Sequence, residues 1–369
     1  MAWRYGLIAL GSVFLATIFL GLEKFSGNIT GFFRIGSVLP LSPFLDPQQA
    51  FIFKDQLGYD GQQFLSIALD PFLQNDGTIA ALDHPSYRYR RILYPLLGYL
   101  FGLGNPQWIP YALVSINILA IALITVIVAF YNQSRGAEPN KSLFVLTIPG
   151  VWITLTLSTA DLLGSLLTLA AIHFEHRDRP RLTTGMIALA LLTRETLVII
   201  WLAFLINNLW LKRQRFILPL ILAPFPAIVW NGYIWLRQLP GATGMGNFGL
   251  PGVGVVEKIQ QILKTGITAN NSFEAYLFLL LIVGFALVLW SSYRFPTHNH
   301  TLRWGTWLYL GLFLSSSLLI LDYFLNYTRV FLDVYLFGLL VLHNYPFPWK
   351  NSFFTASGIS SLAFLVFHS

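Results

Sequence analysis

The chain has 369 residues, of which 55% are hydrophobic and only 11% are charged, and its mean hydropathy is +0.63. Such a composition excludes an ordinary water-soluble globular domain and indicates that lipid is part of the solvent. The formal net charge of +7 could indicate nucleic-acid binding, but basic residues cluster between apolar segments, which is typical of membrane orientation. Cysteine is absent from the sequence, which excludes disulfides, a thiolate nucleophile and a thiolate metal site.

Uncharged apolar runs recur along the chain and predict a single membrane domain, residues 1–369, that is all-α and polytopic with about 11 transmembrane helices. The runs cover residues 7–22, 108–131, 143–157, 162–173, 186–193, 196–211, 216–236, 275–290, 306–321, 330–342 and 353–367. Several runs are shorter than the ~20 residues of a straight spanning helix, so neighbouring helices are expected to shield their ends.

Basic residues in short loops predict the orientation of these helices. If the N-terminus is cytoplasmic, every short basic loop falls on the cytoplasmic side, including the clusters at 177–181 and 212–215. Two long loops, residues 23–107 and 237–274, then lie on the extracytoplasmic side, and the second, rich in glycine, is a candidate lid. This alternation between the two sides of the membrane depends on dividing the apolar regions at 157–162 and at 193–196 into two helices each. If only one of these regions were a single helix, the orientation of every later helix would be reversed.

Three short polar tips are predicted to face the same extracytoplasmic side. They are residues 158–161, 193–195 and 322–329, which carry Asp161, Arg194, Glu195 and Arg329. An ionisable group near hydrocarbon depth costs roughly 2.5–3.5 kcal/mol on insertion scales, so such groups usually mark a functional cavity.

The first long loop is predicted to contain two short amphipathic helices. Residues 61–69 place the apolar side chains of Phe64, Ile67 and Ala68 on one face, which is expected to lie on the membrane. Asp60 would be the N-cap of this helix, and the Asp-Pro pair at 70–71 would end it. A second element is expected at about 92–103, just after a basic run.

Two motifs of the first loop resemble a known family. Residues 59–68 read Tyr-Asp-Gly-Gln-Gln-Phe-Leu-Ser-Ile-Ala, and residues 89–97 read Tyr-Arg-Arg-Ile-Leu-Tyr-Pro-Leu-Leu. They resemble the aromatic-Asp-Gly-x-x-aromatic-x-x-Ile-Ala and aromatic-Pro-Leu motifs of GT-C superfamily membrane glycosyltransferases, in particular bacterial relatives of the PIG-V-type mannosyltransferases. The polar tips are similar to positions that recur in bacterial cell-surface glycopolymer formation proteins.

The resemblance implies an inverting transferase with a GT-C-like bundle in the bacterial inner membrane. Such an enzyme moves a hexose, for example mannose, from a polyprenyl-phosphate carrier to a glycan or lipid acceptor on the extracytoplasmic face. Neither a soluble nucleotide sugar nor a cofactor would be required, and no nucleic acid would be a partner. The acidic residue that the family needs in its first loop corresponds to Asp60.

The residue types fit this chemistry. A carboxylate can take the proton of an attacking hydroxyl, and guanidinium forks match the oxygens of a departing phosphate. Asp60 would be the general base, and the expected phosphate ligands are Arg90, Arg91, Arg194 and Arg329. Tyr59, Tyr89 and Tyr94 would stack on sugar faces, and the supporting residues would be Asp161, Glu195 and Asp55. Asp55 could share a divalent cation with Asp60, but their separation is not a recognised ligand spacing, so no metal ligands are assigned and the use of a divalent cation stays open.

Structural roles compete with these assignments. Asp60 and Asp161 can be helix caps, Arg90 and Arg91 can anchor the loop to lipid headgroups, Arg194 and Glu195 can pair with each other, and Arg329 can reach the membrane interface. Two other functions also remain open at this point: a transporter or flippase of lipid-linked sugars, which would do no chemistry, and a subunit that only binds a partner enzyme.

Overall fold

The computed structural model describes residues 1–369 except 242–244, 267, 269–270, 295–299, 343–348 and 369. Nearly all regular structure in this part of the chain is helical, which confirms the all-α prediction. The two strands found there, β1 (Ile35–Gly36) and β2 (Ile52–Phe53), form a small parallel pair in which Ile35 lies opposite Ile52. This pair ties together the two arms of the first long loop.

The helices follow one another closely along the chain. The N-terminal part contains α1 (Ala2–Phe25), the 3₁₀ helix η1 (Ile29–Phe33), α2 (Asp60–Leu69), α3 (Asp76–Ala80), α4 (Pro85–Arg88), α5 (Leu93–Phe101) and α6 (Ile109–Ser134). The central part contains η2 (Pro139–Thr147), α7 (Pro149–Thr156), α8 (Asp161–His176), α9 (Pro180–Leu191), η3 (Glu195–Leu197), α10 (Val198–Trp210), α11 (Gln214–Leu222) and α12 (Phe225–Leu236). The remaining elements are η4 (Met245–Asn247), α13 (Val253–Thr265), α14 (Ser272–Arg294), α15 (His300–Ser315), α16 (Leu318–Leu321), α17 (Phe324–Val330), α18 (Leu332–Leu342), α19 (Lys350–Ala363) and the π-helical turn η5 (Phe364–His368).

Four helices in the described ranges are long and apolar enough to cross a membrane: α1, α6, α14 and the continuous stretch Gln214–Leu236 made by α11 and α12. A fifth is obtained if α17 and α18, which meet at a bend of 46°, form one span. The chain therefore has membrane-spanning character, but a count of 11 transmembrane helices is not confirmed. Other apolar runs are interrupted; residues 143–157, for example, divide between η2 and α7, and residues 306–321 between α15 and α16.

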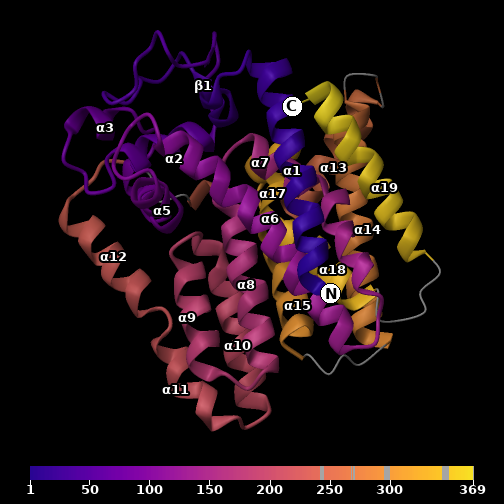
Figure 1. Ribbon diagram of the computed structural model, residues 1–369. Helices are drawn as coiled ribbons and strands as arrows, with labels where there is room; N and C mark the ends of the chain where they lie inside the picture. Colours follow the sequence, from indigo (N-terminus) through magenta and orange to yellow (C-terminus); the bar gives the residue numbers. More distant parts are fainter. Residues whose placement is uncertain (242–244, 267, 269–270, 295–299, 343–348, 369) are drawn as a thin grey trace.

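The long helices frame the molecule. α1 packs against α6, and α8 against α9, in a bundle that α14 and α19 extend on one side (Figure 1). The N-terminus lies at one end of α1 and the C-terminal turn at the other, where Lys24 Nζ donates to the carbonyl oxygen of Val366 at 3.0 Å (Figure 1). Leu7, Leu15 and Leu22 on α1 are exposed, as expected for side chains that face lipid.

Helix α2 differs from its prediction as a surface helix. Every residue from Gly61 to Leu69 is buried, because α2 packs against α5, α6 and η1. The polar residues among them find partners inside the protein: Gln62 Oε1 accepts from the backbone N–H of Gly36 at 3.0 Å, and Ser66 donates to the carbonyl of Gln62 at 2.9 Å. The prediction that α2 lies on the membrane was therefore wrong, and its apolar face is part of the protein core.

Candidate active site

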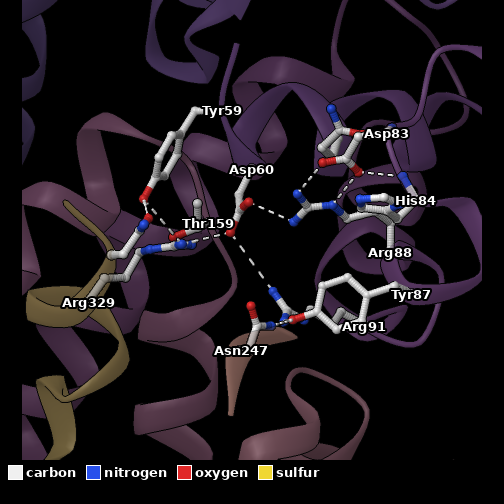
Figure 2. A network of polar contacts seen from close by, with 12 residues as sticks. Tyr59, Asp60, Asp83, His84, Tyr87, Arg88, Arg91, Thr159, Asn247 and Arg329 are labelled. Carbon is white, nitrogen blue, oxygen red and sulfur yellow. Dashed lines mark hydrogen bonds and ion pairs between the residues drawn. The ribbon is translucent and has the colours of Figure 1, made fainter. Parts of the chain in front are cut away.

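Asp60 is the first residue of α2, and its carboxylate is surrounded by arginines (Figure 2). Arg88 Nη1 donates to Asp60 Oδ1 at 2.6 Å, Arg329 Nη2 donates to Oδ2 at 2.7 Å, and Arg91 Nη1 lies 3.9 Å from Oδ2. The N-cap of α2 is Tyr59, so the prediction that Asp60 caps the helix was wrong. The reason is that hydrogen bonds between charged groups are stronger than a bond to a backbone N–H.

Close backbone packing holds the start of α2 in place. A Cβ atom on Gly61 would lie 2.2 Å from the carbonyl oxygen of Leu157 and 2.8 Å from that of Phe33, so only glycine fits there. The N–H of Tyr59 also donates to the carbonyl of Arg34 at 3.1 Å. Through these contacts the chain positions Asp60 beside the polar tip that follows α7.

Asp161 supplies a second carboxylate and is the first residue of α8. Its Oδ1 accepts from Arg194, and its Oδ2 accepts from Thr159 Oγ1 at 2.6 Å and from Arg329 Nη1 at 3.2 Å. Arg329, on α17, therefore bridges Asp60 and Asp161 with its two terminal nitrogens. Both aspartates stand at helix N-termini, where the helix dipole favours a negative charge.

Two further ion pairs continue the network. Arg88 Nε and Nη2 donate to the carboxylate of Asp83 at 2.8 and 2.6 Å. Arg91 forms a two-pronged pair with Glu195, in which Nε donates at 2.8 Å and Nη2 at 2.6 Å, and its guanidinium lies 4.6 Å from the ring centroid of Tyr87. Arg88 and Arg91 are thereby held between acidic residues of the first loop and of η3.

These residues line a cavity of about 760 Å³. The lining also includes apolar side chains, which are those of Phe248, Leu312, Leu319, Ile320 and Val330. Arg90 also lines the cavity, and within the described part of the chain its side chain has no ion pair or hydrogen bond. The site thus combines fixed charges, one uncommitted guanidinium and a hydrophobic surface.

The charge state of Asp60 follows from its surroundings. Burial alone would raise the pKa of this carboxyl group, but the guanidinium groups of Arg88, Arg329 and Arg91 hold the pKa well below its ordinary value. Burial likewise tends to raise the pKa of Asp83, and its hydrogen bonds and charge interaction with Arg88 lower it overall. Asp60 is therefore ionised at neutral pH, but its lone pairs are already committed to arginines.

The structure brings together most of the site residues expected from sequence. Asp60, Arg91, Arg194, Glu195, Arg329, Tyr59 and Arg90 line the cavity, and Asp161 joins them through Arg194 and Arg329. The hydroxyl of Tyr59 donates to Asn326 Oδ1, and the Arg329 guanidinium lies 5.1 Å from the Tyr59 ring centroid. Arg194 and Glu195 do not pair with each other, a possibility that the sequence left open. Arg194 pairs with Asp161, and Glu195 pairs with Arg91.

Tyr89, Tyr94 and Asp55 lie outside the cavity lining. The two tyrosine rings are fully buried, and their hydroxyls donate to the carbonyl oxygens of Asp70 at 2.9 Å and of Leu113 at 3.0 Å. These rings therefore pack in the protein interior and are not available to stack on a sugar. Asp55 is exposed in the loop after β2, where its N–H donates to Ser37 Oγ at 2.9 Å.

Among the cavity-lining residues that sequence reasoning missed are Asp83, Tyr87 and Arg88. Arg88 in particular was treated only as part of the basic run, although it makes a 2.6 Å contact with Asp60. Arg88 is the last residue of α4 and Arg91 lies in the turn after it, where the Arg91 N–H donates to the carbonyl of Arg88 at 3.2 Å.

The described residues contain no group of three or more His, Cys, Asp or Glu side chains that could hold a metal ion. The ion-pair network could instead bind an anion, because each of its guanidinium groups has donors that match phosphate oxygens. No family model matches the chain, and no curated protein or solved structure matches it either.

Proposed function

We propose that this chain is a glycosyltransferase that moves a hexose, such as mannose, from a polyprenyl-phosphate carrier to a glycan or lipid acceptor. The observation that carries the proposal is the position of one ionised carboxylate, Asp60, among guanidinium groups in a cavity that is partly lined by apolar side chains. The three features match the three parts of the reaction: a base for the acceptor, cations for the phosphate and a hydrophobic surface for the prenyl chain.

The balance of charge favours a donor with a single negative charge. Five arginines line the cavity, namely Arg88, Arg90, Arg91, Arg194 and Arg329. Four of them pair with the carboxylates of Asp60, Asp83, Asp161 and Glu195. One positive charge, on Arg90, is left over. The phosphodiester of a polyprenyl-phosphate sugar carries one negative charge, whereas a diphosphate linkage carries more.

In the proposed reaction the donor phosphate competes with Asp60 for the guanidinium groups of Arg88 and Arg329. Asp60 is then free to accept the proton of the acceptor hydroxyl while that oxygen attacks the anomeric carbon from the face opposite the phosphate. The bond between the anomeric carbon and the phosphate oxygen breaks, and the polyprenyl phosphate leaves as an anion held by arginine. The product has inverted stereochemistry because displacement occurs in one step.

The proposal includes a location and a topology. We place the protein in a bacterial inner membrane as a GT-C-like bundle of about 11 helices, with a cytoplasmic N-terminus and the Asp60 cavity on the extracytoplasmic side. Gly246, Asn247 and Phe248 from the second long loop line the cavity, which supports a role for that loop as a lid. Reporter fusions at Arg177, Arg215 and Gln260 test this arrangement, and a cytoplasmic Gln260 would contradict it.

The transfer reaction is tested with an Asp60→Asn variant in membranes supplied with a panel of polyprenyl-phosphate sugars. Loss of the base is expected to lower the rate by about 10²–10⁴-fold. Asp178→Asn is the matched control, because Asp178 also pairs with an arginine, Arg215, but lies outside the lining of the cavity; its rate should equal that of the wild-type protein.

Two results would contradict the proposal. A wild-type protein that moves lipid-linked sugar across the membrane without forming a glycosidic bond, with Asp60→Asn retaining that activity, would be a flippase. A protein that binds polyprenyl phosphate but never turns over any sugar of the panel would be a binding subunit.

A further inference from the structure

A second cavity, of about 1060 Å³, lies where α1 ends and α6 begins. Its lining comes from three segments, residues 26–30, 44–50 and 105–111, and we call it the polar groove. None of its lining residues also lines the Asp60 cavity. The groove is therefore separate from the Asp60 cavity.

The lining of the polar groove is close to neutral. It includes one acidic side chain, Asp46, and neither lysine nor arginine. The Asp60 cavity, by contrast, is lined by five arginines. A phosphate or other anion would find no cationic partner among the residues of the groove and would meet the carboxylate of Asp46, so an anionic ligand is disfavoured.

Exposed aromatic rings contribute to the lining of the groove. Trp108 and Tyr111 are 62% and 51% exposed, and their ring centroids lie 6.1 Å apart with the planes tilted by 53°. Phe44, 41% exposed, belongs to another of the three segments. Rings in such positions offer two adjacent electron-rich faces to C–H groups of a ligand.

Amide side chains supply the polar part of the groove. Gln49 and Gln107 are exposed, and neither side chain has a hydrogen bond within the described ranges. A side-chain amide carries both donors and an acceptor, which suits a ligand rich in hydroxyl groups. Aromatic faces beside free amides match a sugar ring, which presents C–H groups on its faces and hydroxyls at its edge.

The walls of the groove are fixed by hydrogen bonds before any ligand arrives. Asn28 Nδ2 donates to the carbonyl of Gln49 at 2.7 Å, while its Oδ1 accepts from the N–H of Thr30 at 3.0 Å, which joins two of the segments. Asn105 Oδ1 accepts from the N–H of Gln107 at 2.9 Å and so orders the third. A preorganised site loses less entropy on binding.

We propose that the polar groove binds a neutral carbohydrate chain. Aromatic residues at the ends of spanning helices commonly form a belt at the membrane interface, but belt residues face lipid and need no concave, amide-lined surface. The combination of concavity, neutral lining and paired rings favours a saccharide over a lipid.

The position of the groove suggests what the bound carbohydrate does. The helix η1 begins in the groove with Ile29 and ends at Phe33, whose carbonyl oxygen would lie 2.8 Å from a Cβ atom added to Gly61, the neighbour of Asp60. At a rise of ~2 Å per residue, a 3₁₀ helix of this length spans about 10 Å. A glycan held in the groove would therefore lie near the Asp60 site, and its role as acceptor rests on the proposed transferase function.

Binding is measured by saturation-transfer NMR on the full-length protein in lauryldimethylamine oxide, since detergents with sugar headgroups would compete. The probes are mannopentaose, cellopentaose and chitopentaose. Wild-type protein is expected to bind at least one of them, and Trp108→Ala should weaken that binding by about tenfold or more, because truncated aromatic anchors dominate binding energies. Gln107→Ala should weaken it less.

Trp210→Ala is the matched control, because Trp210 is 75% exposed but lies at the end of α10. It should bind as wild type does. The proposal is overturned if wild-type protein binds none of the three oligosaccharides, or if Trp108→Ala and Gln107→Ala, with wild-type unfolding temperatures, bind them as wild type does. Asp60→Asn should retain binding, so loss of transfer and loss of carbohydrate binding are separate outcomes.

Discussion

A methyl group added at Gly61 tests whether the start of α2 is seated as closely as the structure shows. In Gly61→Ala the new Cβ would lie 2.2 Å from the carbonyl oxygen of Leu157, whereas ordinary contact begins at 3.4 Å. The helix start must therefore retreat by about 1.2 Å, the difference between these distances. Overpacking of this kind costs about 1–3 kcal/mol of stability. A misplacement of about 1 Å at a reacting group can lower a rate by ~10²-fold, so transfer activity should fall by about that factor.

The measurement is thermal unfolding of the purified protein together with transfer of hexose from a polyprenyl-phosphate donor. Gly185→Ala in α9 is the control, because nothing lies within 4 Å of its new Cβ. Alanine is favoured over glycine within a helix by roughly 0.5–1 kcal/mol, so this control should be as stable as wild type or slightly more so. Unchanged unfolding temperature and activity in Gly61→Ala would refute the close contact between α2 and residue 157.

Three further predictions follow from the buried charges. Arg329→Met leaves the carboxylates of Asp60 and Asp161 without their shared cation and should lower the free energy of unfolding in denaturant by about 3–5 kcal/mol. Adding Asp161→Asn should restore part of that stability. Unchanged stability of Arg329→Met would contradict the bridge between the two carboxylates. The pKa of Asp60 is lower in the folded protein than in the unfolded chain, so its ionised carboxylate stabilises the fold fully above the unfolded pKa of ~3.9. This stabilisation is lost as the pH falls. The unfolding temperature should therefore drop less steeply in acid for Asp60→Asn than for the wild-type protein. Lys258→Met removes the 2.9 Å partner of Glu274 and should expose α13 to limited proteolysis, whereas equal cleavage of both proteins would show that this pair does not hold the helix.

The convergence of charges could be predicted from the sequence because burial of an ion is costly. Asp161, Arg194 and Arg329 stand in short polar tips between apolar runs, where an unpaired charge would be unfavourable. That cost made a shared cavity with Asp60 the simplest expectation, and Arg329 contacts both carboxylates. The function of this cavity stays a prediction.

Other features could not be predicted, because the same sequence pattern is compatible with two different structures. The spacing of Phe64, Ile67 and Ala68 is the same for a helix on a membrane surface and for one inside the protein, and only tertiary packing selects the second. The sequence does not reveal the partners of Tyr89 and Tyr94, because each hydroxyl donates to a backbone carbonyl, which any residue could supply. Short interrupted helices also made the number of spans undecidable from apolar runs alone.

The bridge made by Arg329 has a consequence for biosynthesis. Asp60 can meet Arg88 after only 28 further residues, and Asp161 can meet Arg194 after 33, so each carboxylate acquires a local partner early in translation. Arg329 follows Asp60 by 269 residues and Asp161 by 168. Two half-sites therefore form while the ribosome is still at work, and they are joined only when almost the whole polypeptide has been inserted. A chain that stops before α17 would lack the cation that Asp60 and Asp161 share.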